Sequence, residues 1–250
     1  PYTNAYYQRM NNIIQGVDTY WLALGLRTAF SQRHSIYVDG GENNVRWGVE
    51  LNYNGNNGVM QKSNRNVTGA GFYIDYRIGK FQVKNKTTFT FGNSNDVPFN
   101  SFSDYSHLNP YLRIYDEDGN YLRKLESFSG YAGTLVNPLY EIHNYNSYDK
   151  TKYYEIVDNL LVNWNITKDL RLRLQMSATI KRENSELYKD PASASYGTGN
   201  LAMNGDKSVS SGDSNVIDGT LQLMYNKSIK KHYMNLNLSS NLRSSQYTTE

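Results

Sequence analysis

Residues 156–166 and 170–180 form two runs in which apolar and polar side chains alternate. Because successive side chains of a β-strand point to opposite faces, such alternation is typical of a strand with one apolar face. The even positions of the two runs are apolar except at Asp158, and they hold Ile156, Leu160, Val162, Trp164, Ile166, Leu170, Leu172, Leu174, Met176, Ala178 and Ile180. The odd positions of the second run are polar or small. The two runs therefore predict two strands with one apolar and one polar face each.

The three residues between the runs, 167–169, have the length of a hairpin loop. Such a loop places Trp164 opposite Leu172 and Ile156 opposite Ile180, with the last loop residue in the left-handed conformation. Each run has about the length that a tilted strand needs to cross a bilayer. We therefore expect two neighbouring strands of a transmembrane β-barrel, with the apolar face toward lipid and the polar face toward the lumen.

Composition excludes several other classes of protein. Hydrophobic residues make up 38% of the 250 residues, the mean hydropathy is −0.69, and no stretch has the roughly 20 apolar residues of a transmembrane helix. A net charge of +3 without a block of Lys or Arg argues against a nucleic-acid partner. The absence of Cys excludes disulfide bonds and thiolate metal sites. The 23 Tyr residues suit a membrane interface, and they also suit a soluble β-protein.

The same alternation recurs along the chain and divides it into two parts. Residues 1–27 predict a short helix and a lead-in, and residues 28–250 predict a partial barrel with a long loop at 92–152. The strands are expected near residues 28–38, 45–53, 67–78, 81–91, 153–166, 170–182, 214–227 and 232–246. In the last pair, a loop at 228–231 places Leu223 opposite Leu236.

The connections between these expected strands alternate in length. The short ones are 39–44, 79–80, 167–169 and 228–231, and the long ones are 54–66, 92–152 and 183–213. Outer-membrane barrels have short turns on the periplasmic side and long loops outside, whereas a soluble sandwich has no reason to sort its loops in this way. The fold class that we predict is all-β: an antiparallel, up-and-down transmembrane β-barrel portion, about eight strands of a larger barrel, with long extracellular loops.

Two groups of residues are candidates for binding. On the lumen side, the polar positions could contact a solute or a plug that fills a wide barrel, or form the ordinary wet face of a sheet; they include Arg46, Glu50, Arg171, Arg173 and Gln175. In the long loop, aromatic residues could stack on sugar rings or pack against a partner, or pack the loop onto itself; they are Phe99, Phe102, Tyr105, Tyr111, Tyr115 and Tyr131.

Catalytic and metal sites are not predicted. The four His residues are widely spaced, without the HxxxH or HxH patterns that bind a metal, and no Gly-x-Ser-x-Gly nucleophile motif is present. A Ser-His-Asp arrangement needs only proximity in space, so it is not excluded by spacing. We expect no enzyme activity, no cofactor and no metal.

Several segments resemble the early barrel of SusC/RagA-type TonB-linked outer-membrane transporters. These segments appear in the order of that family and cover most of the chain: 26–41 (LRTAFSQRHSIYVDGG), 51–60 (LNYNGNNGVM), 101–105 (SFSDY), 109–111 (NPY), 137–140 (NPLY) and 164–170 (WNITKDL). The resemblance implies a barrel of about 22 strands closed by an N-terminal plug, in the outer membrane of a Gram-negative, Bacteroidota-like bacterium. It also implies a SusD-like surface lipoprotein as a lid and TonB-powered import of glycans or peptides.

The sequence departs from that family by lacking the plug and the TonB box and by having too few strands for the barrel. We therefore expect an internal barrel fragment in which residues 1–27 follow a missing plug domain. TonB would be a partner through that plug, and the other partners would be membrane lipid, the lipoprotein and the substrate. The alternative is a soluble, aromatic-rich β-sandwich that binds carbohydrate, and a third class is a barrel enzyme. Extraction separates the first two hypotheses: the barrel fragment should need detergent, whereas the soluble sandwich should stay in aqueous buffer.

Overall fold

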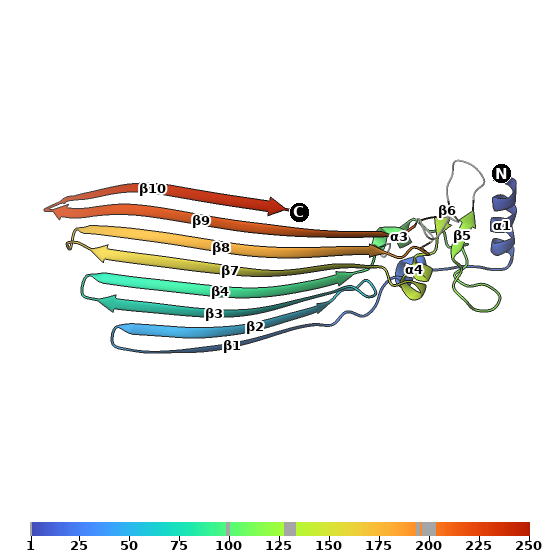
Figure 1. The fold of residues 1–250 in the computed structure, drawn as a ribbon, viewed down its shortest axis with the longest axis horizontal. Helices are drawn as coiled ribbons and strands as arrows, with labels where there is room; N and C mark the ends of the chain where they lie inside the picture. Colours follow the sequence, from blue (N-terminus) through green and yellow to red (C-terminus); the bar gives the residue numbers. More distant parts are fainter. Residues whose placement is uncertain (1, 99–100, 128–133, 194–195, 197–203) are drawn as a thin grey trace.

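Eight long strands form one antiparallel sheet in the computed structural model, which describes residues 2–98, 101–127, 134–193, 196 and 204–250 (Figure 1). The order of the strands is β1-β2-β3-β4-β7-β8-β9-β10, so neighbours in the chain are neighbours in the sheet except across the long loop. The strands are β1 Ser31–Glu42, β2 Val45–Asn57, β3 Asn64–Ile78, β4 Phe81–Asp96, β7 Tyr148–Asn165, β8 Leu170–Lys189, β9 Asp206–Ile229 and β10 His232–Thr249. The predicted up-and-down arrangement of eight strands is confirmed. The sheet is open, with β1 and β10 at its edges.

The strands extend further than the apolar alternation predicts. β8 continues to Lys189 instead of 182, and β9 begins at Asp206 instead of 214. These additional segments pair with each other, from Glu183 opposite Gly212 to Lys189 opposite Asp206. Backbone hydrogen bonds do not require apolar side chains, so the ladder continues beyond the region that alternation marks.

The links between strands are sorted by length onto opposite ends of the sheet. Residues 43–44, 79–80, 166–169 and 230–231 lie at one end, called the turn end below. The links 58–63, 97–147 and 190–205 leave and rejoin the strands at the other end, called the loop end (Figure 1). The predicted sorting is confirmed, although the first long link is shorter than expected because β2 and β3 extend into it.

The register of the β7–β8 hairpin is confirmed, whereas the predicted conformation of its turn is wrong. Trp164 lies opposite Leu172, as expected. Asp169 does not have the positive φ predicted for it. The hydroxyl of Thr167 instead accepts the N–H groups of Asp169 at 3.2 Å and Leu170 at 3.0 Å. This side-chain turn satisfies the backbone without a left-handed residue.

The register of the last hairpin differs from the prediction by two residues. Leu223 lies opposite Leu238 rather than Leu236, because the turn is the two-residue link 230–231 and not a four-residue loop. Lys230 takes the left-handed conformation that this tight turn needs, with φ of 52°. A shift by two residues keeps every side chain on its original face, so the apolar face is preserved.

One face of the sheet is apolar and is called the outward face below. Phe91 lies opposite Tyr154 near the loop end, and Phe81 stacks on Trp164 near the turn end with ring centroids 5.4 Å apart. The segment of β4 from Phe81 to Phe91 is ~33 Å long. A strand tilt of about 40° reduces its height along the barrel axis to ~25 Å. That is the height of the apolar band in outer-membrane barrels, and aromatic residues border it at both ends.

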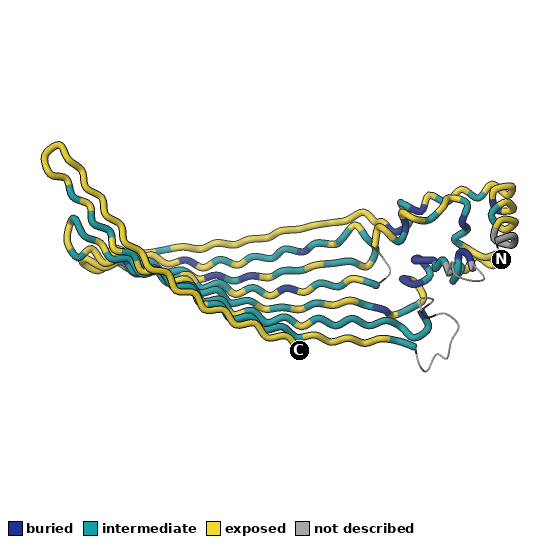
Figure 2. Tube along the Cα trace, turned by 90° about the horizontal axis from the view of Figure 1, so that it is seen from above, coloured by how far each residue is buried: buried dark blue, intermediate teal, exposed yellow. Residues whose placement is uncertain are grey.

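Nothing in the described residues covers this outward face with a second layer. Trp164 is 37% exposed, Met176 41% and Leu221 47%, and the tube view shows no second sheet behind the strands (Figure 2). The one carboxylate in the band, Asp158, is hydrogen-bonded by Asn85 at 2.9 Å and Thr87 at 2.6 Å. These partners reduce the cost of placing an acidic residue among apolar ones. The second layer that a β-sandwich requires is therefore absent from the described part of the chain.

Buried apolar side chains gather at the loop end instead. Residues 2–27, 101–127 and 134–147 form a small unit there, called the loop module below, with α1 Tyr2–Ile14, α2 Trp21–Leu24, α3 Phe102–Ser106, β5 Lys124–Ser127, β6 Thr134–Val136 and α4 Pro138–Asn144. Its core comprises Trp21, Tyr105, Leu112, Leu125, Leu139 and Ile142. The expected N-terminal helix is present, and the long loop contains two helices and a hairpin. None of the described helices has the length and apolar character needed to cross a membrane.

The N-terminal segment is attached to the long loop by specific contacts. Arg9 forms a two-pronged ion pair with Glu126, with both N–O distances 2.6 Å, and Glu126 is only 5% exposed. The hydrogen bond with this partner raises the pKa of Arg9, so the guanidinium stays charged. Asn12 donates to the carbonyl of Tyr111 at 3.1 Å, and Thr19 donates to the carbonyl of Leu112 at 2.8 Å. These contacts join two segments about a hundred residues apart into one unit.

Candidate functional site

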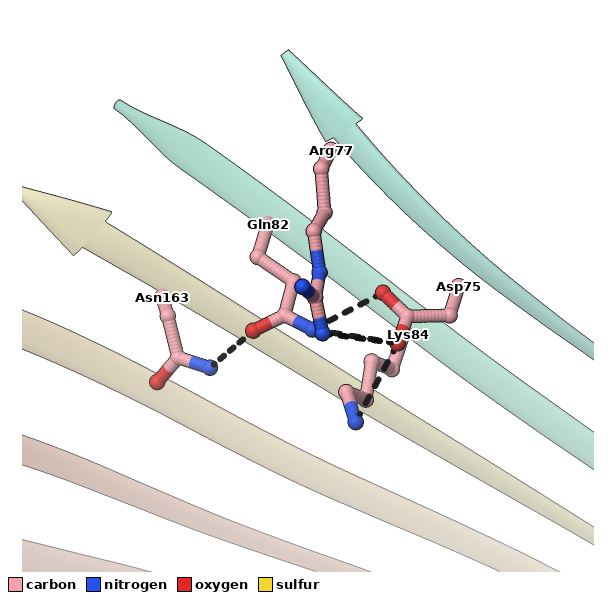
Figure 3. A network of polar contacts seen from close by, with 5 residues as sticks. All are labelled: Asp75, Arg77, Gln82, Lys84 and Asn163. Atoms are coloured by element: carbon pink, nitrogen blue, oxygen red, sulfur yellow. Dashed lines mark hydrogen bonds and ion pairs between the residues drawn. The ribbon is translucent and has the colours of Figure 1, made fainter. Parts of the chain in front are cut away.

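A chain of polar contacts crosses four strands on the face opposite the apolar band, called the polar face below, and Figure 3 shows its part on β3, β4 and β7. Asp75 of β3 accepts hydrogen bonds from Gln82 of β4 at 2.8 and 3.1 Å and pairs with Lys84 at 3.3 Å. The amide of Gln82 accepts in turn from Asn163 of β7 at 3.3 Å, and Asn163 accepts from Arg173 of β8 at 3.0 Å. The contacts hold these side chains in place near the turn end of the polar face.

All five residues predicted for the lumen side lie on this polar face. Arg173 belongs to the network, and Glu50 pairs with Lys86 at 3.4 Å. Arg171 donates to Asn165 at 2.8 Å. The remaining two, Arg46 and Gln175, are exposed. Their role in contacting a solute or a plug stays a prediction.

A cavity of about 610 Å³ opens on the polar face at the loop end, and it is called the mouth cavity below. Its charged lining has both signs: Arg65, Asp96, Glu155, Lys181 and Glu183. Lys181 pairs with Glu183 at 2.7 Å, and both side chains remain partly exposed. Charges of both signs around one cavity suit a ligand that itself carries both signs.

An aromatic side chain also borders the mouth cavity. Tyr153 lies over Gly92 of the neighbouring strand, where an added Cβ would come within 2.1 Å of the Tyr153 ring. Any larger residue at position 92 would therefore displace this ring. The ammonium of Lys181 is 5.2 Å from the centre of the same ring. Sequence reasoning missed the mouth cavity. A signal for it was present, because Glu155, Lys181 and Glu183 are charged residues at odd positions just beyond the two apolar runs.

The aromatic residues predicted for ligand contact divide into three groups. Phe102 is 49% exposed and Tyr115 45% exposed, so both rings are accessible. Tyr105 is only 1% exposed and lies in the core of the loop module, so in this structure it packs the loop and does not face a ligand. Tyr111 is half-buried and packs against that core. The other two, Phe99 and Tyr131, lie outside the described residues.

Three neighbouring rings, Tyr115, Tyr121 and His143, lie on the loop module and are called the aromatic ladder below. Tyr115 and Tyr121 have ring centroids 4.9 Å apart, and Tyr121 is stacked on His143 at the same distance. The hydrogen bond with Tyr115 raises the pKa of Tyr121. Partial burial and the nearby charge of Lys62 lower the pKa of His143, so the imidazole is neutral at pH 7. A neutral, flat surface of this kind is suited to stacking on sugars or on aromatic side chains.

The described residues contain no group of three or more His, Cys, Asp or Glu side chains placed to hold a metal ion. The arrangements described above are cavities, charge pairs and aromatic surfaces.

No family model and no curated protein matches this chain. Solved structures do match it. Chains of the RagAB peptide importer in the "closed-closed" state and in the "open-open" state have TM-scores of 0.66 at 13% and 14% identity. A further structure of the RagAB peptide transporter has a TM-score of 0.67 at 13% identity.

In each case the match covers 93% of this chain and 30% of the solved chain. The chain therefore spans less than a third of the length of the structures that it resembles. The resemblance to SusC/RagA-type transporters seen in the sequence is confirmed at the level of the fold: the chain has the architecture of part of such a barrel. The structures that it resembles are those of a transporter and not of an enzyme.

Proposed function

We propose that this chain forms part of the barrel of an outer-membrane importer of nutrients in a Gram-negative, Bacteroidota-like bacterium. The observation that carries the proposal is a meander sheet with an uncovered apolar face and with links sorted by length onto opposite ends. An uncovered apolar face of this size is stable only against another apolar phase, which lipid supplies. The short turns would lie in the periplasm, and the loop module would lie outside the cell.

The open edges of the sheet support completion of the barrel by further strands. β1 and β10 each have one unpaired edge in the described structure, and such edges are unstable in a bilayer unless the barrel is closed. The polar face would line the lumen, and Arg46, Glu50, Arg171, Arg173 and Gln175 would face the substrate path or a plug. Coupling to TonB through such a plug is part of the proposal.

The loop module would meet a SusD-like surface lipoprotein acting as a lid. Two of its features support this role: the exposed ring of Phe102 and the aromatic ladder, which includes Tyr115. Exposed aromatic residues on a rigid support are typical of protein interfaces. The buried core of the module and the Arg9–Glu126 ion pair supply that rigidity.

Between peptides and oligosaccharides, the mouth cavity favours peptides. Glu155, Glu183, Lys181 and Arg65 present both signs of charge there, which match the charged termini and side chains of short peptides. Neutral oligosaccharides carry no charges that could pair with these groups. The aromatic ladder could serve either class.

Fractionation and uptake test the proposed function. The protein at its natural length should sediment with outer membranes, resist extraction by alkaline carbonate and dissolve in detergent. Cells lacking it should lose uptake of a fluorescent peptide mixture, and the gene should restore that uptake. A protein found in the aqueous fraction would contradict the membrane proposal, and intact peptide uptake in the deletion strain would contradict the peptide class.

Replacing Glu155 and Glu183 by Gln should weaken the binding of cationic peptides. Both carboxylates line the mouth cavity, so their loss removes attraction for a positive ligand; we expect a roughly 3- to 10-fold higher Kd, with little change for an anionic peptide. Isothermal titration with matched peptides measures the difference. Glu186→Gln is the control, because Glu186 lies on the outward face of β8, the strand that also carries Glu183. An equal loss in the control would contradict the assignment of the mouth cavity.

A further inference from the structure

The outward face changes from apolar to basic at the loop end. Toward the loop end from Tyr154, the next outward positions of β7 are Lys152 and Lys150. Arg182 of β8 lies directly opposite Tyr154. These cations therefore begin where the apolar band and its aromatic border end.

Two adjoining cavities open at this boundary. The one nearer the loop end has a volume of about 680 Å³ and is lined by Lys62, Lys150 and Lys152 with Asn, Ser and Tyr residues. The one nearer the band has a volume of about 320 Å³. They share Lys152 and Asn93 in their linings, so they adjoin each other and are together called the depression below. None of the residues lining either cavity is Asp or Glu, in contrast to the mouth cavity on the other face.

The smaller cavity combines apolar and cationic groups. Phe91 and Tyr154 form its apolar part, and Arg182 lies at its edge, paired with Asp213. A ligand that filled both cavities would need an anionic head toward the loop end and an apolar part along the band. That is the chemistry of a membrane lipid with an acidic headgroup.

The two lysines of β7 have positive charges that the protein compensates only in part, through the electrostatic attraction between Lys150 and Glu186. The ammonium of Lys150 is 4.0 Å from the centre of the Tyr148 ring, and Lys152 forms no ion pair within the described residues. The nearest carboxylate on this face, Glu186, lies opposite Lys150. It is already engaged by Lys207 at 2.8 Å and by the hydroxyl of Tyr148 at 2.6 Å.

We propose that this depression binds a phosphate group of the phosphorylated glycolipid in the outer leaflet, the lipid A part of lipopolysaccharide. The proposal rests on the proposed function, since only a membrane barrel with its loop end outside presents these residues to that leaflet. Lys150 and Lys152 bind the phosphate as point charges, Lys62 adds to the positive field, and an acyl chain lies against Phe91 and Tyr154.

Lipid binding to the purified protein at its natural length tests the site. Bisphosphorylated lipid A is titrated into the detergent-solubilised protein and bound lipid is counted by native mass spectrometry, with the dephosphorylated lipid as the second ligand. The variant K150Q/K152Q should lose roughly 30-fold in affinity for the phosphorylated lipid, which is about fivefold for each lysine. The control K230Q/K231Q removes the same charge from the turn end and should bind normally.

Any of the following outcomes would overturn the inference. Unchanged binding by K150Q/K152Q, or an equal loss in K230Q/K231Q, would show that no lipid site lies at the loop end. An equal preference of the unmodified protein for dephosphorylated lipid would remove the role of phosphate, and displacement by millimolar inorganic phosphate would indicate a free-anion site. Peptide uptake is measured separately. A failure of lipid binding with intact uptake would contradict this inference without contradicting the proposed function.

Discussion

Replacing Met176 by Arg should destabilise the protein in a bilayer by about 2–4 kcal/mol, the cost of a cation near the midplane of a barrel's lipid face. Met176 points to the outward face, opposite Leu160 on one side and Gly219 on the other. It lies between the aromatic borders, too far from either end for a long side chain to reach water easily. Urea unfolding in lipid vesicles, followed by the loss of strand signal, measures the effect.

The adjacent residue gives a matched control on the same strand. Gln175 points to the polar face and is exposed, so Gln175→Arg should change the free energy of unfolding by less than about 0.5 kcal/mol. A small effect for both variants would show that the apolar face does not meet lipid. A large effect for both would show that the polar face is packed against another part of the protein, as a plug would do.

Trp21→Ala should destabilise the loop module by about 3–5 kcal/mol and leave the sheet folded. Trp21 is 2% exposed in the core of the module, and its indole nitrogen donates to the carbonyl of Asn109 at 3.1 Å. The truncation therefore leaves a cavity in the core, while the carbonyl of Asn109 keeps its hydrogen bond from the N–H of Leu112. Limited proteolysis measures the effect: cleavage should appear within residues 101–127 while the strands stay protected.

Two further variants separate packing from hydrogen bonding in this core. Trp21→Phe keeps most of the ring volume and loses the N–H group, so it should cost about 1–2 kcal/mol. Phe102→Ala changes an exposed ring on the same module and should cost less than about 0.5 kcal/mol. Equal protease sensitivity in Trp21→Ala and Phe102→Ala would contradict the assignment of Trp21 to the core. Loss of protection in the strands would show that the module and the sheet unfold together.

A neighbouring glycine shows how closely this core is packed. A Cβ on Gly25 would come within 2.4 Å of the ring of Tyr105, which is itself fully buried. Burial raises the pKa of Tyr105, so its hydroxyl stays protonated at physiological pH. Tyr105 thus packs the core of the loop module, which is a different role from the ligand contact expected from its sequence.

The candidate site was only partly accessible to sequence reasoning. Alternation assigned Arg171 and Arg173 to the polar face, because the period of a strand is a local property. The hairpin register placed Arg173 opposite Asn163, but it could not show that Asn163 reaches Gln82 and, through it, Asp75, since those contacts depend on the order of strands in the sheet. The mouth cavity was missed for the same reason, because its lining comes from five strands and a loop.

The sequence by itself determined the strands, their faces and the register of the β7–β8 hairpin, because side-chain alternation and loop length act over short distances along the chain. Only the tertiary structure decided that residues 2–27 pack with the long loop into one module, and that cations and cavities gather at the loop end of the outward face. Those features depend on contacts between residues far apart in the chain. No local period records such contacts, and the energies that select them come from burial and charge pairing in three dimensions.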